Sequence, residues 1–182
     1  MREKFLLFQK NLSSDDIVCI DETGFKLHMT TRYAWSAKGT RAIDHAPASK
    51  GKTITTIGAI SKTGFVCSAI GYGGTSSNSF YAFMKDELFP RLKTGTIIIL
   101  DNLSAHKDNR VKSLAETLGL KLVFQPPYSP EFNPIELAWN TIKTFVRSKR
   151  PRTFQSLEKD FLYAIESMPS SYFLQWFQIC GF

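Results

Sequence analysis

"IIILD", residues 97–101, is the segment that sets the fold class. Its four apolar residues are continuous rather than alternating with polar ones, which is typical of a strand buried on both faces of a parallel sheet. The aspartate that follows them is Asp101. The same pattern occurs earlier as "IVCID", residues 17–21, which ends in Asp21. If the two segments are neighbouring parallel strands, their acidic ends meet in one crevice at the edge of the sheet.

The segments around these two strands predict an α/β fold with a mixed central sheet flanked by helices. Two β-branched runs are joined by Lys62-Thr63-Gly64, a spacing that indicates a hairpin. The other elements follow from apolar periodicity and from helix start signals. Strands are expected at 53–61, 64–73 and 121–125, and helices at 77–89, 109–118, 134–148 and 154–168. We expect a single domain over 1–182, with the aromatic carboxyl-terminal segment packed on its body.

Composition excludes several classes of protein. The 182 residues are 43% hydrophobic and 21% charged, as in an ordinary globular fold. No apolar run approaches the ~18 residues of a membrane helix, and the start of the chain lacks the features of a signal peptide. Cys19, Cys67 and Cys180 are odd in number and far apart, which argues against a disulfide framework and against a cysteine-rich zinc site. A reducing cytoplasm is the simplest expectation.

The net charge of +7 is concentrated in two stretches. Residues 26–52 contain six basic residues and one acid, and residues 143–152 contain five basic residues and no acid. Two basic patches on a mildly acidic body indicate a polyanionic partner. Solvated surface charge is the alternative interpretation.

A proline-rich segment delivers a third carboxylate. "QPPYSPEFNPIELAWNTIK", residues 125–143, places four prolines within nine residues, and a helix then begins at Pro134. Glu136 in its first turn has two interpretations. It could complete a capping box with Asn133 as the N-cap residue. It could instead join Asp21 and Asp101 in one crevice, although a lone aspartate after a strand is commonly a cap or turn former.

Three carboxylates in one crevice would bind hard divalent cations, Mg²⁺ or Mn²⁺, through oxygen. Two such ions, roughly 3.5–4 Å apart, activate a water or hydroxyl and stabilise the leaving oxygen of a phosphodiester. The chemistry indicated by this interpretation is therefore phosphodiester cleavage.

The helix that starts at Pro134 also carries a polar stripe. Asn140, Lys143 and Arg147 follow Glu136 at +4, +7 and +11, on one face of the helix. This row would suit a phosphate backbone, as would Lys38 and Arg41 from the first basic stretch. A solvated helix face remains the alternative.

Three further polar residues adjoin the two aspartates. Glu22 and Asn102 directly follow Asp21 and Asp101, and His106 lies five positions beyond Asp101. We interpret them as candidates for supporting positions around the site. For His106, a capping or surface role is an equal alternative.

Three blocks of the sequence resemble the catalytic blocks of DDE transposases of the mariner superfamily, in its bacterial insertion-sequence branch. They are "CIDETGF" (19–25), "LDNLSAHK" (100–107) and "PPYSPEFNPIELAWNTIK" (126–143). The 34 residues between Asp101 and Glu136 also fit that branch. The resemblance covers nearly the whole chain. It implies a ribonuclease H-like fold and two Mg²⁺ or Mn²⁺ ions bound by Asp21, Asp101 and Glu136.

The resemblance further implies cut-and-paste transposition. Strands would be cleaved at element ends, and the freed 3′-hydroxyl would attack target DNA, typically at a TA dinucleotide. The implied partners are transposon ends, target DNA and a second copy of the chain in the DNA complex, at the nucleoid of a bacterial cell. Family members carry helix-turn-helix modules before the catalytic domain. Only twenty residues precede Asp21, so we expect these modules to be absent. A non-catalytic remnant that binds DNA or a partner remains the alternative.

Overall fold

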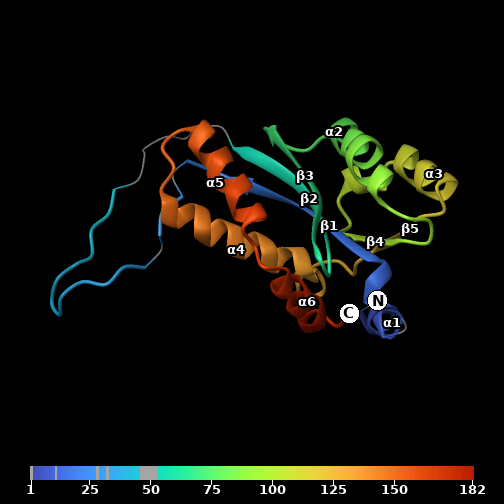
Figure 1. Cartoon of the computed structure of the whole chain (residues 1–182), viewed down its shortest axis with the longest axis horizontal. Coiled ribbons are helices and arrows are strands. Elements are labelled where there is room, and N and C mark those ends of the chain that lie inside the picture. Colours follow the sequence, from blue (N-terminus) through green and yellow to red (C-terminus); the bar gives the residue numbers. More distant parts are fainter. Residues whose placement is uncertain (1, 11, 28, 32, 46–52) are drawn as a thin grey trace.

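A mixed five-stranded sheet lies at the centre of the computed structural model, which describes residues 2–10, 12–27, 29–31, 33–45 and 53–182 (Figure 1). Its strand order is β3-β2-β1-β4-β5. The strands are β1 (Ile17–Phe25), β2 (Ile54–Ser61), β3 (Gly64–Tyr72), β4 (Ile97–Leu100) and β5 (Lys121–Phe124). The predicted hairpin and the predicted mixed sheet are confirmed.

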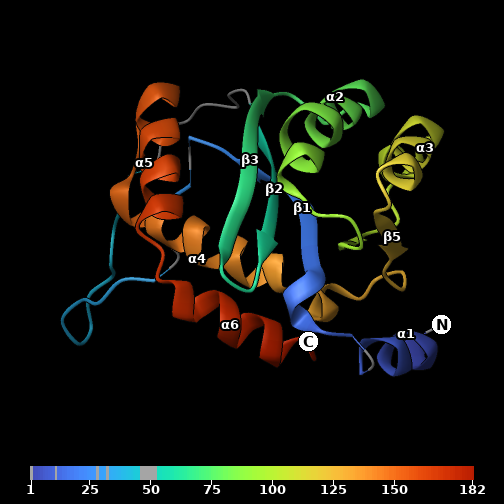
Figure 2. The same cartoon turned by 45° about the vertical axis from the view of Figure 1, so that its right-hand side comes forward.

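Helices cover both faces of the sheet (Figure 2). One face carries α1 (Arg2–Gln9), α4 (Pro134–Lys149), α5 (Phe154–Glu166) and α6 (Ser170–Ile179). The other carries α2 (Ser77–Ala82), a π-helical turn η2 (Phe83–Leu88), a 3₁₀ turn η3 (Phe89–Arg91) and α3 (Asn109–Thr117). Further 3₁₀ turns are η1 (Ser14–Asp16), η4 (Ser104–Lys107) and η5 (Pro130–Phe132). None of the helices in these described ranges has the length and apolar character that crossing a bilayer requires.

The two acid-bearing strands are parallel neighbours, which meets the condition for a shared crevice. β1 pairs with β4 from Ile17 to Cys19, and Asp21 therefore lies two residues beyond the last parallel pair. The expectation that Asp21 ends its strand is wrong, because β1 continues to Phe25 in antiparallel pairing with β2. Asp101 directly follows β4 and does end its strand.

The alternation of β1 sends its two acids to opposite faces of the sheet. Cys19 belongs to the apolar core beneath α4, whereas Ile20 belongs to the core beneath α2 and α3. Since successive side chains of a strand point to opposite faces, Asp21 follows Cys19 to the α4 side. Glu22 follows Ile20 to the α2 side.

A glycine allows α4 to lie close to the sheet. Gly58 of β2 is the cross-strand partner of Asp21. A Cβ atom at position 58 would lie 2.5 Å from Cη2 of Trp139, a buried residue one turn after Glu136. The absent side chain therefore sets the height of α4, and with it of Glu136, above Asp21.

Two helical segments differ from the sequence expectations, whereas the carboxyl-terminal segment agrees with them. The sequence did not indicate α1, which buries Phe5 against the α4 side of the core. The helix expected at 77–89 ends as an α-helix at Ala82 and continues as the π-helical turn. The aromatic carboxyl-terminal segment packs on the body as predicted, with Phe173 and Phe177 buried in the core.

Candidate active site

The three predicted carboxylates line one pocket of about 400 Å³. Asp21 comes from β1, Asp101 from the residue after β4, and Glu136 from the first turn of α4. The proline-rich segment from Gln125 to Pro130 forms much of the remaining wall. The structure thus brings residues from three separate parts of the sequence to one hollow.

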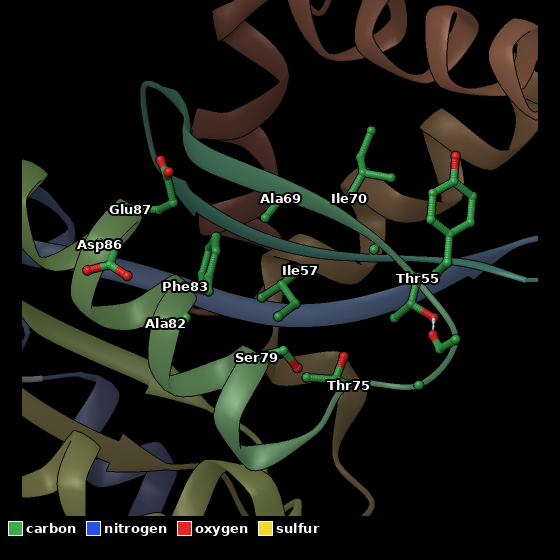
Figure 3. A pocket seen from close by; sticks show the side chains of 14 residues that line it. Thr55, Ile57, Ala69, Ile70, Thr75, Ser79, Ala82, Phe83, Asp86 and Glu87 are labelled. Atoms are coloured by element: carbon green, nitrogen blue, oxygen red, sulfur yellow. Dashed lines mark hydrogen bonds between the residues drawn. The ribbon is translucent and has the colours of Figure 1, made fainter.

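A second pocket, of about 350 Å³, lies between the β2–β3 hairpin and α2 with its π-helical turn (Figure 3). Its wall is mostly apolar or neutral, with Asp86 and Glu87 on the helical turn. None of the predicted site residues lines it. We therefore place the candidate site in the carboxylate pocket, where the acidic groups interact with one another.

Asp21 is the most perturbed of the three carboxylates. It is only 9% exposed. Burial raises its pKa to about 8, and the negative charges of Glu136 and Asp101 add to this effect, although the backbone N–H of Glu22 opposes it. A buried carboxylate facing two others is costly unless a cation neutralises them. The pocket therefore favours a bound cation.

Asp101 is held by the loop that follows it. Its Oδ1 accepts a hydrogen bond from the Leu103 backbone N–H at 3.0 Å and lies 2.5 Å from Nδ1 of His106. The Nδ1 group does not align with this oxygen as a hydrogen bond, so the contact is an ion pair. Burial alone would raise the pKa of Asp101, but His106 and the Leu103 N–H together lower it. Asp101 is thus held as the anion.

His106 links the two strands from behind the site. Its ring is fully buried and packs 4.3 Å from the Phe80 ring, while Nε2 lies 3.2 Å from Oε1 of Glu22. Burial alone would lower the pKa of His106, but Asp101 and Glu22 raise it to about 9. The imidazolium therefore bridges Glu22 on β1 to Asp101 after β4. This geometry places Glu22 and His106 at the supporting positions that we predicted, and their roles stay predictions.

Asn102 supports a different part of the wall. Its side-chain Nδ2 donates to the backbone oxygen of Gln125, the first residue after β5. The loops that follow β4 and β5 are thereby joined beside the pocket, which both residues line.

The structure separates the two interpretations of Glu136. Asn133 is the N-cap of α4, and its Oδ1 accepts from the Ile135 N–H at 3.4 Å. A capping box would need the Asn133 N–H to donate to Glu136. That N–H donates instead to the Pro130 oxygen at 2.9 Å. Glu136 is thus not engaged as a cap, and it lines the pocket. Partial burial raises the pKa of Glu136, although Lys143 opposes this effect.

Asn133 has a second contact that the sequence did not reveal. Its Nδ2 donates to the Ile20 oxygen at 3.2 Å. Asn133 is 3% exposed, and Ile20 directly precedes Asp21. One side chain therefore caps the helix that carries Glu136 and ties this helix to the strand that carries Asp21. The two residues are 113 positions apart, so no local sequence pattern could indicate the contact.

Comparison with known proteins places this geometry in a family. Residues 16–158 match the family described as DDE superfamily endonuclease. The chain belongs to this family. The resemblance that its three sequence blocks predicted is confirmed.

One curated relative of this DDE endonuclease chain is an uncharacterized 39 kDa protein of insertion element IS630 from Shigella sonnei. It is 28% identical over 152 residues, which are 81% of this chain and 44% of the relative. The chain thus spans less than half the length of that relative.

Solved structures of the Mos1 transposase share the fold. The paired-end complex with the left transposon end has a TM-score of 0.81 at 17% identity and covers 97% of this chain and 55% of that one. The strand transfer complex has a TM-score of 0.79, also at 17% identity, over 97% and 55% of the two chains. The Mos1 catalytic domain with Raltegravir and Mg has a TM-score of 0.65 at 14% identity, over 97% and 84%. The predicted ribonuclease H-like fold is confirmed.

The donor set of this DDE endonuclease chain fits a hard divalent cation, because it consists of carboxylate oxygens. In the described part of the chain, no three carboxylate, imidazole or thiolate groups converge into a ready-made cage. Mg²⁺ commonly keeps several waters and is held by one or two carboxylates together with substrate phosphates. A pocket of about 400 Å³ leaves room for both.

The predicted polar row on α4 divides into two parts. Lys143 is half-buried; burial is the main cause that lowers its pKa, and the nearby Glu136 and Asp21 carboxylates oppose this effect. Its ammonium group therefore belongs to the electrostatic surroundings of the pocket. Asn140 is exposed, and Arg147 is half-buried.

The two basic stretches adjoin at the far end of α4. Lys38 and Arg41 are exposed on the segment 33–45, which extends away from the body (Figure 1). Arg150 makes a two-pronged contact with Asp44 of that segment, at 3.2 and 3.1 Å. The DDE endonuclease chain thus presents basic residues from both stretches on connected surfaces. Arg32, Lys50 and Lys52 of the first stretch lie outside the described residues.

Proposed function

We propose that this chain is the DNA-cleaving and strand-joining core of an insertion-element transposase. Asp21, Asp101 and Glu136 hold the divalent metal ions on which both reactions depend. The observation that carries this proposal is the common pocket that these three carboxylates line, reached from two parallel strands and one helix start. Membership of the DDE endonuclease family supports it, as do the Mos1 transposase structures determined with Mn and with Mg.

The residues in and around the pocket have distinct parts in this chemistry. A bound pair of Mg²⁺ or Mn²⁺ ions supplies Lewis acidity to the attacking oxygen and to the leaving oxygen. Asp21 and Glu136 would hold the metal ions, and the phosphodiester would be positioned by its attraction to those positive charges. His106 keeps Asp101 ionised and oriented, and Lys143 adds a positive charge for the phosphate.

The substrates in this proposal are transposon ends and target DNA. Two copies of the chain act together, as a cut-and-paste reaction must bring two ends to one target. The Mos1 paired-end complex with a transposon end lends support to this arrangement.

Nicking of supercoiled plasmid by the purified chain tests the proposal. With Mn²⁺ we expect nicked circles, and with excess EDTA we expect none. If the chain is instead a non-catalytic remnant, it will bind DNA without nicking it under either condition.

DNA binding by this chain is expected to be weak, tolerant of sequence and steeply dependent on salt, because it rests mainly on phosphate contacts. Replacing both Lys38 and Arg41 with alanine should lower the slope of log affinity against log salt by about 2, roughly one unit per lost phosphate contact. Fluorescence anisotropy with a labelled duplex measures this slope. Tight binding to one sequence at physiological salt would contradict the expectation.

The control for this measurement removes two charges elsewhere. Lys85 and Lys121 are exposed on η2 and β5, outside both basic stretches. Their double alanine variant should keep the wild-type slope. An equal loss in both variants would show that only net charge matters.

Replacing Asn133 with serine is expected to weaken Mn²⁺ binding about tenfold or more. Serine can still cap α4, but it is too short to donate to the Ile20 oxygen, so the hydrogen bond that joins the start of α4 to β1 is lost. Supporting contacts of this kind are typically worth 10–100-fold in metal affinity. The midpoint of a Mn²⁺ titration, followed by melting temperature, measures the effect.

Thr153→Ala is the matched control, because Thr153 caps α5 in a complete capping box with Ser156. It should cost about 1 kcal/mol of stability without moving the Mn²⁺ midpoint. If both variants shift the midpoint equally, Asn133 acts through global stability alone.

A further inference from the structure

Tyr128 is the most unusual residue on the wall of the carboxylate pocket. Its side chain is 99% exposed, although it lines the hollow that contains Asp21, Asp101 and Glu136. Its backbone has a φ of 53°, in the left-handed region that a bulky aromatic residue rarely adopts. In the described part of the chain, no ring or cation contact involves Tyr128. A strained residue whose ring has nothing to pack on indicates a function rather than a structural role.

The turn that carries this ring is anchored on both sides. Before it, the Gln125 N–H donates to the Leu100 oxygen at 2.9 Å, next to Asp101. After it, the buried Ser129 donates its hydroxyl to the Pro127 oxygen at 3.2 Å, and the Ser129 oxygen accepts from the Phe132 N–H. Prolines at 126, 127 and 130 fix the backbone further. The backbone that carries the ring is therefore fixed before any ligand arrives.

The surroundings of the ring identify its ligand. It stands at the edge of a pocket whose carboxylates suit a metal-bound phosphodiester, on a chain of net charge +7. The partly exposed Leu103 lines the same pocket and adds apolar surface. A flat aromatic face beside a phosphate site matches a nucleobase, since every base offers a π-face for stacking.

We propose that Tyr128 forms a nucleobase subsite, in which its ring stacks on the base next to the phosphodiester held at Asp21, Asp101 and Glu136. The subsite rests on the proposed function. It reads no sequence, since stacking is tolerant of base identity. Its role is to hold the strand so that the phosphodiester lies over the carboxylates.

Fluorescence of 2-aminopurine tests the stacking without any need for cleavage. Oligonucleotides that carry this base at successive positions are titrated with wild type, Tyr128→Phe and Tyr128→Ala. We expect wild type and the phenylalanine variant to quench one position strongly, because both keep the ring. The alanine variant should not quench it, and its affinity should fall about 5- to 100-fold. Equal quenching by all three proteins would overturn the proposal.

Two further variants separate stacking from folding. Tyr128→Gly relieves the left-handed backbone, so it should raise the melting temperature while it lowers affinity. A structural role for Tyr128 would lower both. Tyr72→Ala removes another exposed tyrosine, at the end of the edge strand β3, and should leave quenching unchanged. An equal effect of Tyr72→Ala would overturn the assignment to Tyr128.

Nicking assays then separate this subsite from the proposed function. The site of nicking in a duplex is mapped first. Wild type and Tyr128→Ala are then compared on duplexes with one abasic position beside that site. If the ring stacks on the missing base, the abasic change slows wild type but not the variant, since the lost contact is the same. If the abasic change and the Tyr128→Ala substitution instead slow nicking by independent factors that multiply, the subsite is overturned and the cleavage function stands. A wild type that quenches but never nicks would refute the cleavage function alone.

Discussion

Replacing Glu136 with glutamine is expected to reduce Mn²⁺-dependent nicking at least about 100-fold while leaving the metal-free protein as stable as the wild type. The amide has nearly the same shape, but it loses the charge and offers a single neutral oxygen to a cation. The capping alternative would permit the exchange, because glutamine serves in a capping box as well as glutamate does. The observed bond from the Asn133 N–H to Pro130 removes that alternative.

The stability of the metal-free Glu136→Gln variant reflects two opposing effects. Loss of a negative charge at a helix start costs roughly 0.3–1 kcal/mol. Relief of repulsion with Asp101 and Asp21 offsets this cost. Melting in EDTA and plasmid nicking in Mn²⁺, both on one preparation, measure the two results. Retained nicking would remove Glu136 from the metal site.

Glu131→Gln is the matched control for this experiment. Glu131 lies in the preceding 3₁₀ turn and pairs with Arg2 rather than with the pocket. The same chemical change at this position should leave nicking within about twofold of wild type. If Glu131→Gln loses as much nicking activity as Glu136→Gln, the loss in both variants is due to surface charge.

Asp21→Asn is expected to make the metal-free protein more stable and to abolish both nicking and stabilisation by Mn²⁺. Burial raises the pKa of Asp21 to about 8 in the folded chain, far above the ordinary value of 3.8 for an aspartate. At neutral pH the folded protein therefore binds a proton that the unfolded chain releases, and this difference lowers stability by an amount on the order of a few kcal/mol. Asparagine has no charge to bury, so it avoids the penalty.

Thermal melting in EDTA at pH 7.5, followed by a Mn²⁺ series, measures both effects of Asp21→Asn. The wild type should melt at rising temperature as Mn²⁺ is added, whereas the variant should start higher and stay constant. Asp86→Asn, at an exposed position of η2, should behave like the wild type. A variant that melts below the wild type in EDTA would show that Asp21 is stabilising without metal.

Much of the fold followed from apolar pattern alone. The run from Ile97 to Leu100 has no polar residue to face solvent, so it favoured a buried strand with Asp101 at its end. The length of β1 could not be predicted in this way. Asp21 and Glu22 interrupt its apolar pattern, while its backbone continues to pair with β2 as far as Phe25.

The candidate site was partly predictable for the same reason. Acids after two similar strands indicate a shared crevice, but the contact of His106 with Glu22 depends on which face each residue occupies. That face follows from strand register and from the position of Phe80, neither of which a local pattern specifies. The bond from Asn133 to Ile20 likewise spans distant parts of the chain and needs the fold to exist first.

The contact of Trp139 with Gly58 has a consequence for how such a chain changes over evolutionary time. Gly58 contributes no chemical group, yet even one methyl group there would meet the indole that holds α4 above Asp21. Under the proposed function, selection for DNA cleavage would act on this empty volume as well as on the three carboxylates. Descendants released from that selection can keep all three acids and still be inactive, and a larger residue at position 58 would reveal it.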